Sequence, residues 1–109
     1  MDALHGYYLE DLEPGMSASF AKTISEADVY GFAEISGDTN PVHINEEYAK
    51  TTVFGQRIAH GMLSGALIST VAGTKLPGPG AIYVDQTLKF KAPLFLGQTA
   101  RAEIVVSAV

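Results

Sequence analysis

The chain has 109 residues, of which 47% are hydrophobic and 17% charged, so it holds enough apolar material for the core of one globular domain. Twelve Asp and Glu residues against seven Lys and Arg give a net charge of -5 at pH 7 without a basic cluster, and nucleic acid is therefore not an expected partner. The absence of cysteine excludes disulfides and thiolate metal sites.

The N-terminal part of the chain predicts a strand followed by a capped helix. Residues 1–15 lack the basic region and apolar run of a signal peptide, which favours a cytoplasmic location. Residues 16–24 alternate between two faces, as the residues of a strand do. Ser25 and Asp28 have the spacing of a capping box, and we expect the helix that they begin to end at Gly37. The sequence SGDTNP around this glycine predicts a loop.

Residues 59–74, AHGMLSGALISTVAGT, predict the central helix of the fold. No charged residue lies between Arg57 and Lys75, and apolar positions surround the whole helix, so we expect strands to bury it on every side. The segment is too short, and too rich in Ser, Thr and Gly, for a membrane span, and a membrane is not an expected partner.

The start of this helix is a candidate binding element. Ile58, Ala59 and His60 precede Gly61, so the usual Ser, Thr, Asp or Asn cap is missing. The free N–H groups of the first turn could then bind a carbonyl or an anion, and Gly61 has no side chain to obstruct the approach. The alternative is that Gly61 and Gly65 only allow a strand to pack closely against the helix.

The C-terminal part predicts two further strands. Residues 81–92 alternate clearly, with one face apolar, and predict a half-buried antiparallel strand; its inward residues are Ile82, Val84, Leu88 and Phe90. Residues 98–109 alternate in the same way, with Ala100, Ala102, Ile104, Val106 and Ala108 facing inward. Three strands are few for a helix that is apolar all round.

Asp38 and His43 are the candidate catalytic residues. They lie five residues apart in the loop before the central helix, and a carboxylate and an imidazole that share one water can act as a general acid and base. The residues alone leave other roles open, since a loop Asp is often a turn residue and a loop His is often solvated. A two-His, one-carboxylate metal site of Asp38, His43 and His60 is not enforced by any spacing, and neither a metal nor another cofactor is expected.

A resemblance adds to this reading. The run from Phe32 to His43, FAEISGDTNPVH, resembles the hydratase 2 motif of the (R)-specific enoyl-CoA hydratases, which belong to the MaoC-like dehydratase family. HGML at 60–63 resembles the second segment of that family, and LPG at 76–78 with Ile82 and Tyr83 resembles its next strand. The similarity extends from Tyr8 onward. The first motif is specific, because Gly-Asp, Asn-Pro and His occur together at fixed spacing.

The family implies an α+β hot dog fold, in which an antiparallel sheet wraps around one long helix, and the activity of a hydro-lyase on enoyl-CoA thioesters. By resemblance, Asp38 and His43 hold the attacking water and the amide of Gly61 binds the thioester oxygen. The resemblance also places four residues at the substrate, with Asn40 ordering the Asp38 loop; these residues are Asn40, His60, Met62 and Ser69.

Relatives continue with two strands after the one expected at 98–109. We therefore expect a single domain, 1–109, that lacks the last two strands of the sheet: the chain is a fragment, or a partner or an exchanged protomer supplies them. An open apolar edge favours a homodimer or a larger assembly. Two other functions remain open, a dehydratase acting on acyl carrier protein and a non-catalytic interaction module. A basic rim would favour the carrier protein, which is acidic; its candidates are Lys50, Arg57, Lys75, Lys89 and Lys91.

Overall fold

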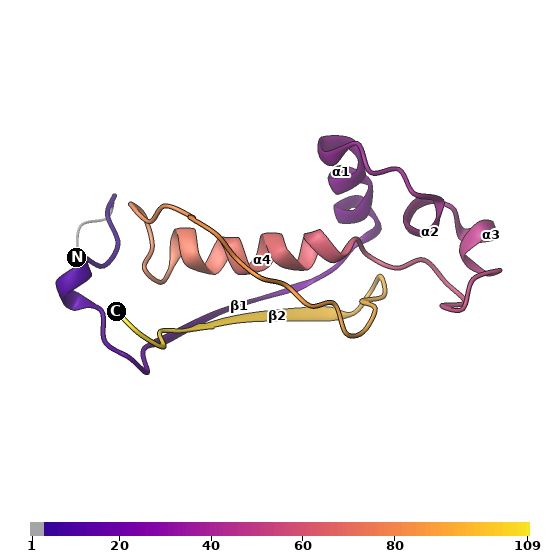
Figure 1. Cartoon of the computed structure of the whole chain (residues 1–109). Helices are drawn as coiled ribbons and strands as arrows, with labels where there is room; N and C mark the ends of the chain where they lie inside the picture. Colours follow the sequence, from indigo (N-terminus) through magenta and orange to yellow (C-terminus); the bar gives the residue numbers. More distant parts are fainter. Residues whose placement is uncertain (1–3) are drawn as a thin grey trace. The chain divides into compact units, whose positions relative to one another are not determined.

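The computed structural model describes residues 4–109 of the chain (Figure 1). These residues form two compact units. The first unit consists of residues 4–21, 65–88 and 101–109, and the second of residues 22–64 and 89–100. The two strands and the longest helix each contribute residues to both units. The expectation of a single domain therefore stays a prediction.

Two of the predicted strands are present, the one expected at 98–109 only as far as Val105. β1 (Ser17–Thr23) and β2 (Thr99–Val105) pair as a two-stranded antiparallel sheet. In the first unit, the N–H of Gly15 donates to Val106 at 2.8 Å, and the N–H of Val106 donates to Met16 at 2.8 Å. In the second unit, the N–H of Ile24 donates to Gln98 at 2.9 Å. A short 3-10 helix, η1 (Leu9–Asp11), precedes β1.

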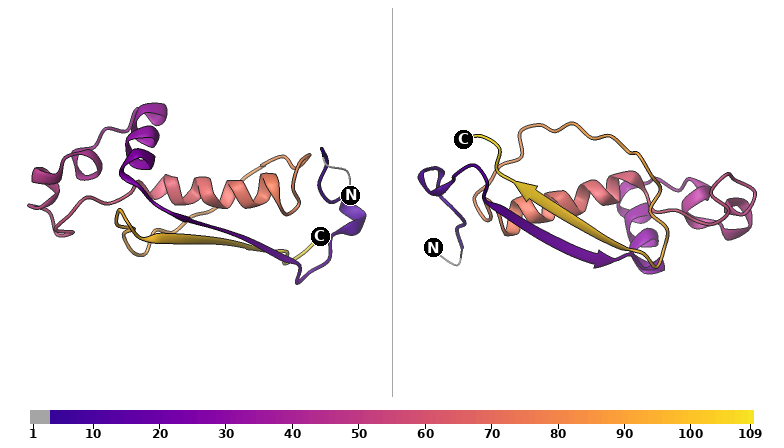
Figure 2. Two further views of the ribbon diagram at one scale, coloured as in Figure 1. Left: turned by 180° about the vertical axis from the view of Figure 1, so that it is seen from behind. Right: turned by 90° about the horizontal axis from the view of Figure 1, so that it is seen from below.

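The predicted central helix is α4 (Gly61–Thr74). Within the first unit this helix runs along the paired strands, and both Figure 1 and Figure 2 show this arrangement. Leu67 and Val71 are buried there, whereas Ala66 and Ser69 are exposed. The expectation that strands bury this helix on every side is therefore wrong: within residues 4–109 the sheet has two strands, and they leave one stripe of the helix uncovered.

The prediction of a strand over residues 81–92 is also wrong. The segment is extended but has no strand pairing, and Ile82 and Val84, which we expected to face inward, are 85% and 89% exposed. Alternation suits a strand, but a strand also needs a neighbour to accept and donate its ladder hydrogen bonds. No described segment lies in that position.

Three helices of the second unit carry the Asp38 loop and its surroundings. They are α1 (Glu26–Ser36), α2 (Pro41–Ile44) and α3 (Glu46–Ala49). The capping box of α1 is confirmed, because the Ser25 hydroxyl accepts from the Asp28 N–H at 3.1 Å and the Asp28 carboxylate accepts from the Ser25 N–H at 2.9 Å. α1 ends at Gly37, whose φ of 79° is left-handed and favours glycine. Across residues 4–109, no helix combines the length and the apolar character that crossing a bilayer requires.

Candidate active site

Local turn chemistry places the Asp38 side chain. The Asp38 carboxylate accepts from the backbone N–H of Asn40 at 3.2 Å, and the Asn40 side chain accepts from the N–H of Val42 at 3.1 Å. Asn40 thereby caps α2, with Pro41 at the first helical position. This short helix, which begins at the last residue of the SGDTNP loop, was not expected. It carries His43. The Asx-type turns of Asp38 and Asn40 thus connect the Asp38 carboxylate to the helix that bears the His43 imidazole.

The His43 ring is buried and oriented by the chain segment that leads into α4. It is 8% exposed, and its Nδ1 lies 2.7 Å from the carbonyl oxygen of Ile58. A carbonyl can only accept, so Nδ1 carries a proton, and in the neutral ring Nε2 keeps a lone pair. Ile58 is itself held on both sides, by its N–H to the carbonyl of Val42 at 3.3 Å and by an antiparallel bridge to Phe95.

His60 lies directly against both residues. It is 3% exposed; its Nε2 lies 2.9 Å from the backbone carbonyl oxygen of Asp38, and its ring stacks on His43 with 3.9 Å between centroids. By the same logic Nε2 carries the proton. Its Nδ1 is buried and has no hydrogen-bond partner among the described residues.

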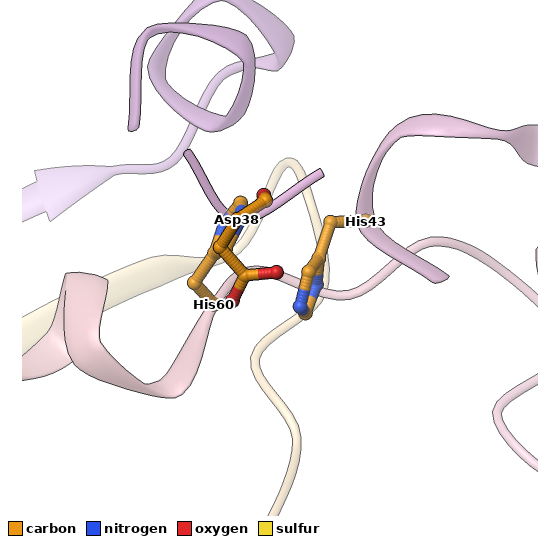
Figure 3. Close-up of side chains that lie close together, drawn as sticks. All are labelled: Asp38, His43 and His60. Carbon is orange, nitrogen blue, oxygen red and sulfur yellow. The ribbon is translucent and has the colours of Figure 1, made fainter. Parts of the chain in front are cut away.

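One nitrogen or oxygen of each of Asp38, His43 and His60 lies within 4.8 Å of the others (Figure 3). The Asp38 carboxylate is directed toward the His43 ring in this view. Ligands of a tetrahedral zinc ion stand about 3.4 Å apart, so the group would have to contract to hold one. The planes of the two stacked rings meet at only 27°, which keeps their in-plane nitrogens from converging on one ion. A water molecule, bonded at longer distances, suits this spacing better.

The three side chains line a cavity of about 570 Å³ in the second unit. This volume is in the range of small-molecule sites. Most of the wall is apolar and comes from Phe32, Phe54, Ile58, Phe90, Pro93 and Leu94. Gly61 and Met62, the first residues of α4, also line it. A polar cluster on an apolar wall, beside a helix N-terminus, can bind a polar head group that carries an acyl chain.

The cavity contains most, but not all, of the residues expected at the site. Asp38, His43, His60, Gly61 and Met62 line it. Asn40 is not a lining residue and caps α2 instead, in agreement with its expected part in ordering the loop. Ser69 belongs to the first unit, and its role at the substrate stays a prediction.

Sequence reasoning missed several lining residues. Ser64 faces the cavity from the first turn of α4, and Lys91 is the cation among the lining residues. The spacing of Ser64 from His60, one helical turn, could have indicated it. Phe54 lies far along the chain from Phe90 and Leu94, and no local pattern in the sequence indicates that they line the same cavity.

Comparisons with known proteins show the family of the chain. Residues 11–109 match the family model described as a MaoC like domain. The chain belongs to the MaoC-like domain family. It is 61% identical to an (R)-specific enoyl-CoA hydratase of Rhodospirillum rubrum, over 99% of this chain and 75% of the relative. It is 52% identical to a 3-hydroxybutyryl-CoA dehydratase of Methylorubrum extorquens, over 92% of this chain and 64% of that relative.

Solved MaoC-like structures confirm the fold. The (R)-hydratase from A. caviae involved in PHA biosynthesis superimposes with a TM-score of 0.89 at 43% identity, covering 92% of this chain and 76% of that one. The chain therefore has the hot dog fold that the family resemblance implied. Its two-stranded antiparallel sheet and long helix are the part of this fold found within residues 4–109.

In this MaoC-like chain, Arg57 fastens the segment before the site to the helices of the second unit. Its side chain is 13% exposed and donates to Glu26 at 2.7 Å, to Glu46 at 3.1 Å and to the Tyr30 hydroxyl at 3.1 Å. In α3 and just after it, Glu46 forms an ion pair with Arg57, whereas Lys50 forms its ion pair with Glu47 at 3.7 Å. Chiefly through its hydrogen bond, Arg57 lowers the pKa of Glu26 below its usual value of 4.5.

Arg57→Met is expected to lower the free energy of unfolding at neutral pH, because it removes three side-chain hydrogen bonds at once. The folded-state pKa of Glu26 is depressed, so its stabilisation is present above pH 4.5 and is lost as pH falls through that lower pKa. Urea unfolding between pH 3 and pH 7 should show the gap between the two proteins narrowing on acidification. A gap that stays constant or widens at low pH would contradict this assignment.

Proposed function

We propose that the chain catalyses the (R)-specific hydration of trans-2-enoyl-CoA to (R)-3-hydroxyacyl-CoA, and the reverse dehydration. One observation carries the proposal: Asp38 and His43, with polar atoms within 4.8 Å, lie on the wall of a largely apolar cavity that also includes the first turn of α4. The hydratase and dehydratase activities of two MaoC-like relatives support the same reaction class.

In the proposed reaction Asp38 and His43 hold the water that adds to C3. In the neutral His43 ring the Nε2 lone pair is free to accept from water. The Asp38 carboxylate is exposed and, within residues 4–109, is bonded only to the Asn40 N–H, so it has acceptor capacity left. Together they remove a proton from the water as it attacks C3 and return a proton to C2. Such pairs typically contribute about 10²- to 10⁴-fold to the rate.

The first turn of α4 is the proposed site of the thioester carbonyl. The four leading N–H groups of a helix have no intrahelical acceptor, and Gly61 is the first residue of this helix and lines the cavity. As a carbanion-like enolate develops, negative charge moves onto the thioester oxygen, and donors at a helix N-terminus stabilise it. Met62 would contact the acyl chain, and Ser69 stays a predicted substrate residue.

Gly61→Ala is expected to lower kcat/KM for enoyl-CoA about 10²-fold, through displacement of the substrate carbonyl. A Cβ at Gly61 would lie 3.1 Å from two carbons of the Phe90 ring, so the ring or the helix start must shift at the cavity wall. Steady-state kinetics measures the loss. Gly73→Ala, on the same helix, is the control, because its Cβ meets nothing within 4 Å. Wild-type kcat/KM in the Gly61 variant would contradict the proposed carbonyl site.

The proposal is tested with crotonyl-CoA and the purified protein. Hydration removes the conjugated double bond and its ultraviolet absorbance without releasing a thiol. Free thiol would instead identify a thioesterase, and neither signal would identify a binding module. The same assay with a crotonyl thioester of acyl carrier protein compares the two carriers. Arg57, one candidate for a basic rim, is already paired with Glu26 and Glu46.

A homodimer or larger assembly and a cytoplasmic location complete the proposal. Ile82 and Val84 are exposed on an extended segment that pairs with no strand of residues 4–109, and such an edge is suited to pairing with another chain. Light scattering should give the mass of a dimer or more. A monomer at micromolar concentration would exclude this assembly.

A further inference from the structure

His60 makes contacts that a histidine buried only for packing does not need. It is 3% exposed, and its ring lies between His43, at 3.9 Å, and Phe32, at 4.9 Å between centroids. Its Nδ1 is buried without a partner among the described residues. Burying an unpaired polar atom costs free energy, and an apolar ring would fill the same space without that cost. The imidazole therefore calls for a reason beyond packing.

The second contact of His60 is with the Asp38 loop. The other hydrogen bonds that the structure shows for residues 37–40 are local and reach no further than four residues along the chain. The bond from His60 Nε2 to the backbone carbonyl of Asp38 spans 22 residues and is 2.9 Å long. Within residues 4–109, this bond is what ties the loop to the start of α4.

We propose that His60 is a positioning residue that fixes the Asp38 carboxylate against the His43 imidazole. This inference rests on the proposed function, in which those two side chains hold the attacking water. His60 holds Asp38 through the backbone and His43 through the ring face, so one side chain sets the distance between the two. Its task differs from the substrate contact that the sequence resemblance implied: it acts through its neighbours.

Three substitutions separate its two contacts. His60→Phe keeps a flat ring against His43 and loses the donor to Asp38. His60→Gln keeps an amide N–H with a reach similar to that of Nε2 and loses the ring. His60→Leu loses both. A displacement of about 1 Å in a reacting group can cost 10²-fold, so we expect His60→Leu and His60→Phe to lower kcat about 10²-fold. Rescue by His60→Gln should bring kcat to within about 10-fold of the wild type, with KM nearly unchanged in all three.

The test combines kinetics on crotonyl-CoA with thermal unfolding of each variant. The double variant Asp38→Asn with His60→Phe should be no slower than Asp38→Asn alone, because a residue that acts through Asp38 has nothing left to position. A His60→Phe protein with wild-type kcat, or a raised KM with unchanged kcat, would overturn the inference. If Asp38→Asn or His43→Asn retained activity, the proposed function itself would fail. If both abolish turnover while His60→Phe does not, only the positioning role fails.

Discussion

Asp38→Asn is expected to lower kcat for enoyl-CoA hydration by about 10²- to 10⁴-fold while leaving the fold intact. The asparagine side chain keeps an oxygen that can accept the Asn40 N–H, so the turn that leads into α2 is preserved. The substitution removes only the negative charge and the basic oxygen that accept a proton from water. Asp38 is exposed, so no buried group loses a partner.

Loss of crotonyl-CoA absorbance over time measures this effect, and circular dichroism verifies the fold. Asp85→Asn is a matched control, because Asp85 is an exposed carboxylate outside the cavity wall. The control should keep the wild-type rate. An Asp38→Asn protein with wild-type turnover would remove Asp38 from the mechanism.

His43→Asn is expected to cause a loss of similar size, about 10²- to 10⁴-fold in kcat. The asparagine amide N–H can replace Nδ1–H as the donor to the Ile58 carbonyl, but nothing replaces the lone pair of Nε2. His43→Ala would in addition leave that carbonyl unpaired, at a cost of about 1 kcal/mol in stability. The pair of variants thus separates the chemical role of the ring from its structural one.

His5→Asn is the control for this substitution. Its Nδ1 also bonds a backbone carbonyl, that of Gly6 at 2.9 Å, and it does not line the cavity. It should leave kcat unchanged. If His43→Asn proved as active as His5→Asn, His43 would have no part in the chemistry.

The sequence predicted best where the cause of the structure is local. Ser25, Asp28 and Gly37 specify the ends of α1 by capping chemistry that acts within a few residues, and the structure confirms them. The spacing of Asp38 and His43 brings them together for the same reason, since two turns and one short helix connect them. Even here α2 itself was missed, because Pro41 reads equally well as a loop residue and as the first residue of a helix.

Predictions failed where the outcome depends on distant partners. The alternation at 81–92 is real, yet Val84 is 89% exposed because no described strand pairs with it. Ser69 is exposed, although the apolar positions all round this helix predicted that it would be buried on every side. In the site, the contact of His60 with the Asp38 carbonyl joins residues 22 positions apart. Phe54 and Phe90 line the same cavity although they lie far apart in the chain. Local sequence patterns carry no information about which distant residues come together in the fold.

The most direct measurement is the hydration of crotonyl-CoA in D₂O, followed by determination of the configuration at C3 and the deuterium content at C2. If Asp38 and His43 deliver the water from their side of the cavity, the product is (R)-3-hydroxybutyryl-CoA with one deuterium incorporated at C2. The Asp38→Asn protein should yield almost none of this product. An (S) or racemic product, or the same product at the same rate without the Asp38 carboxylate, would contradict the account.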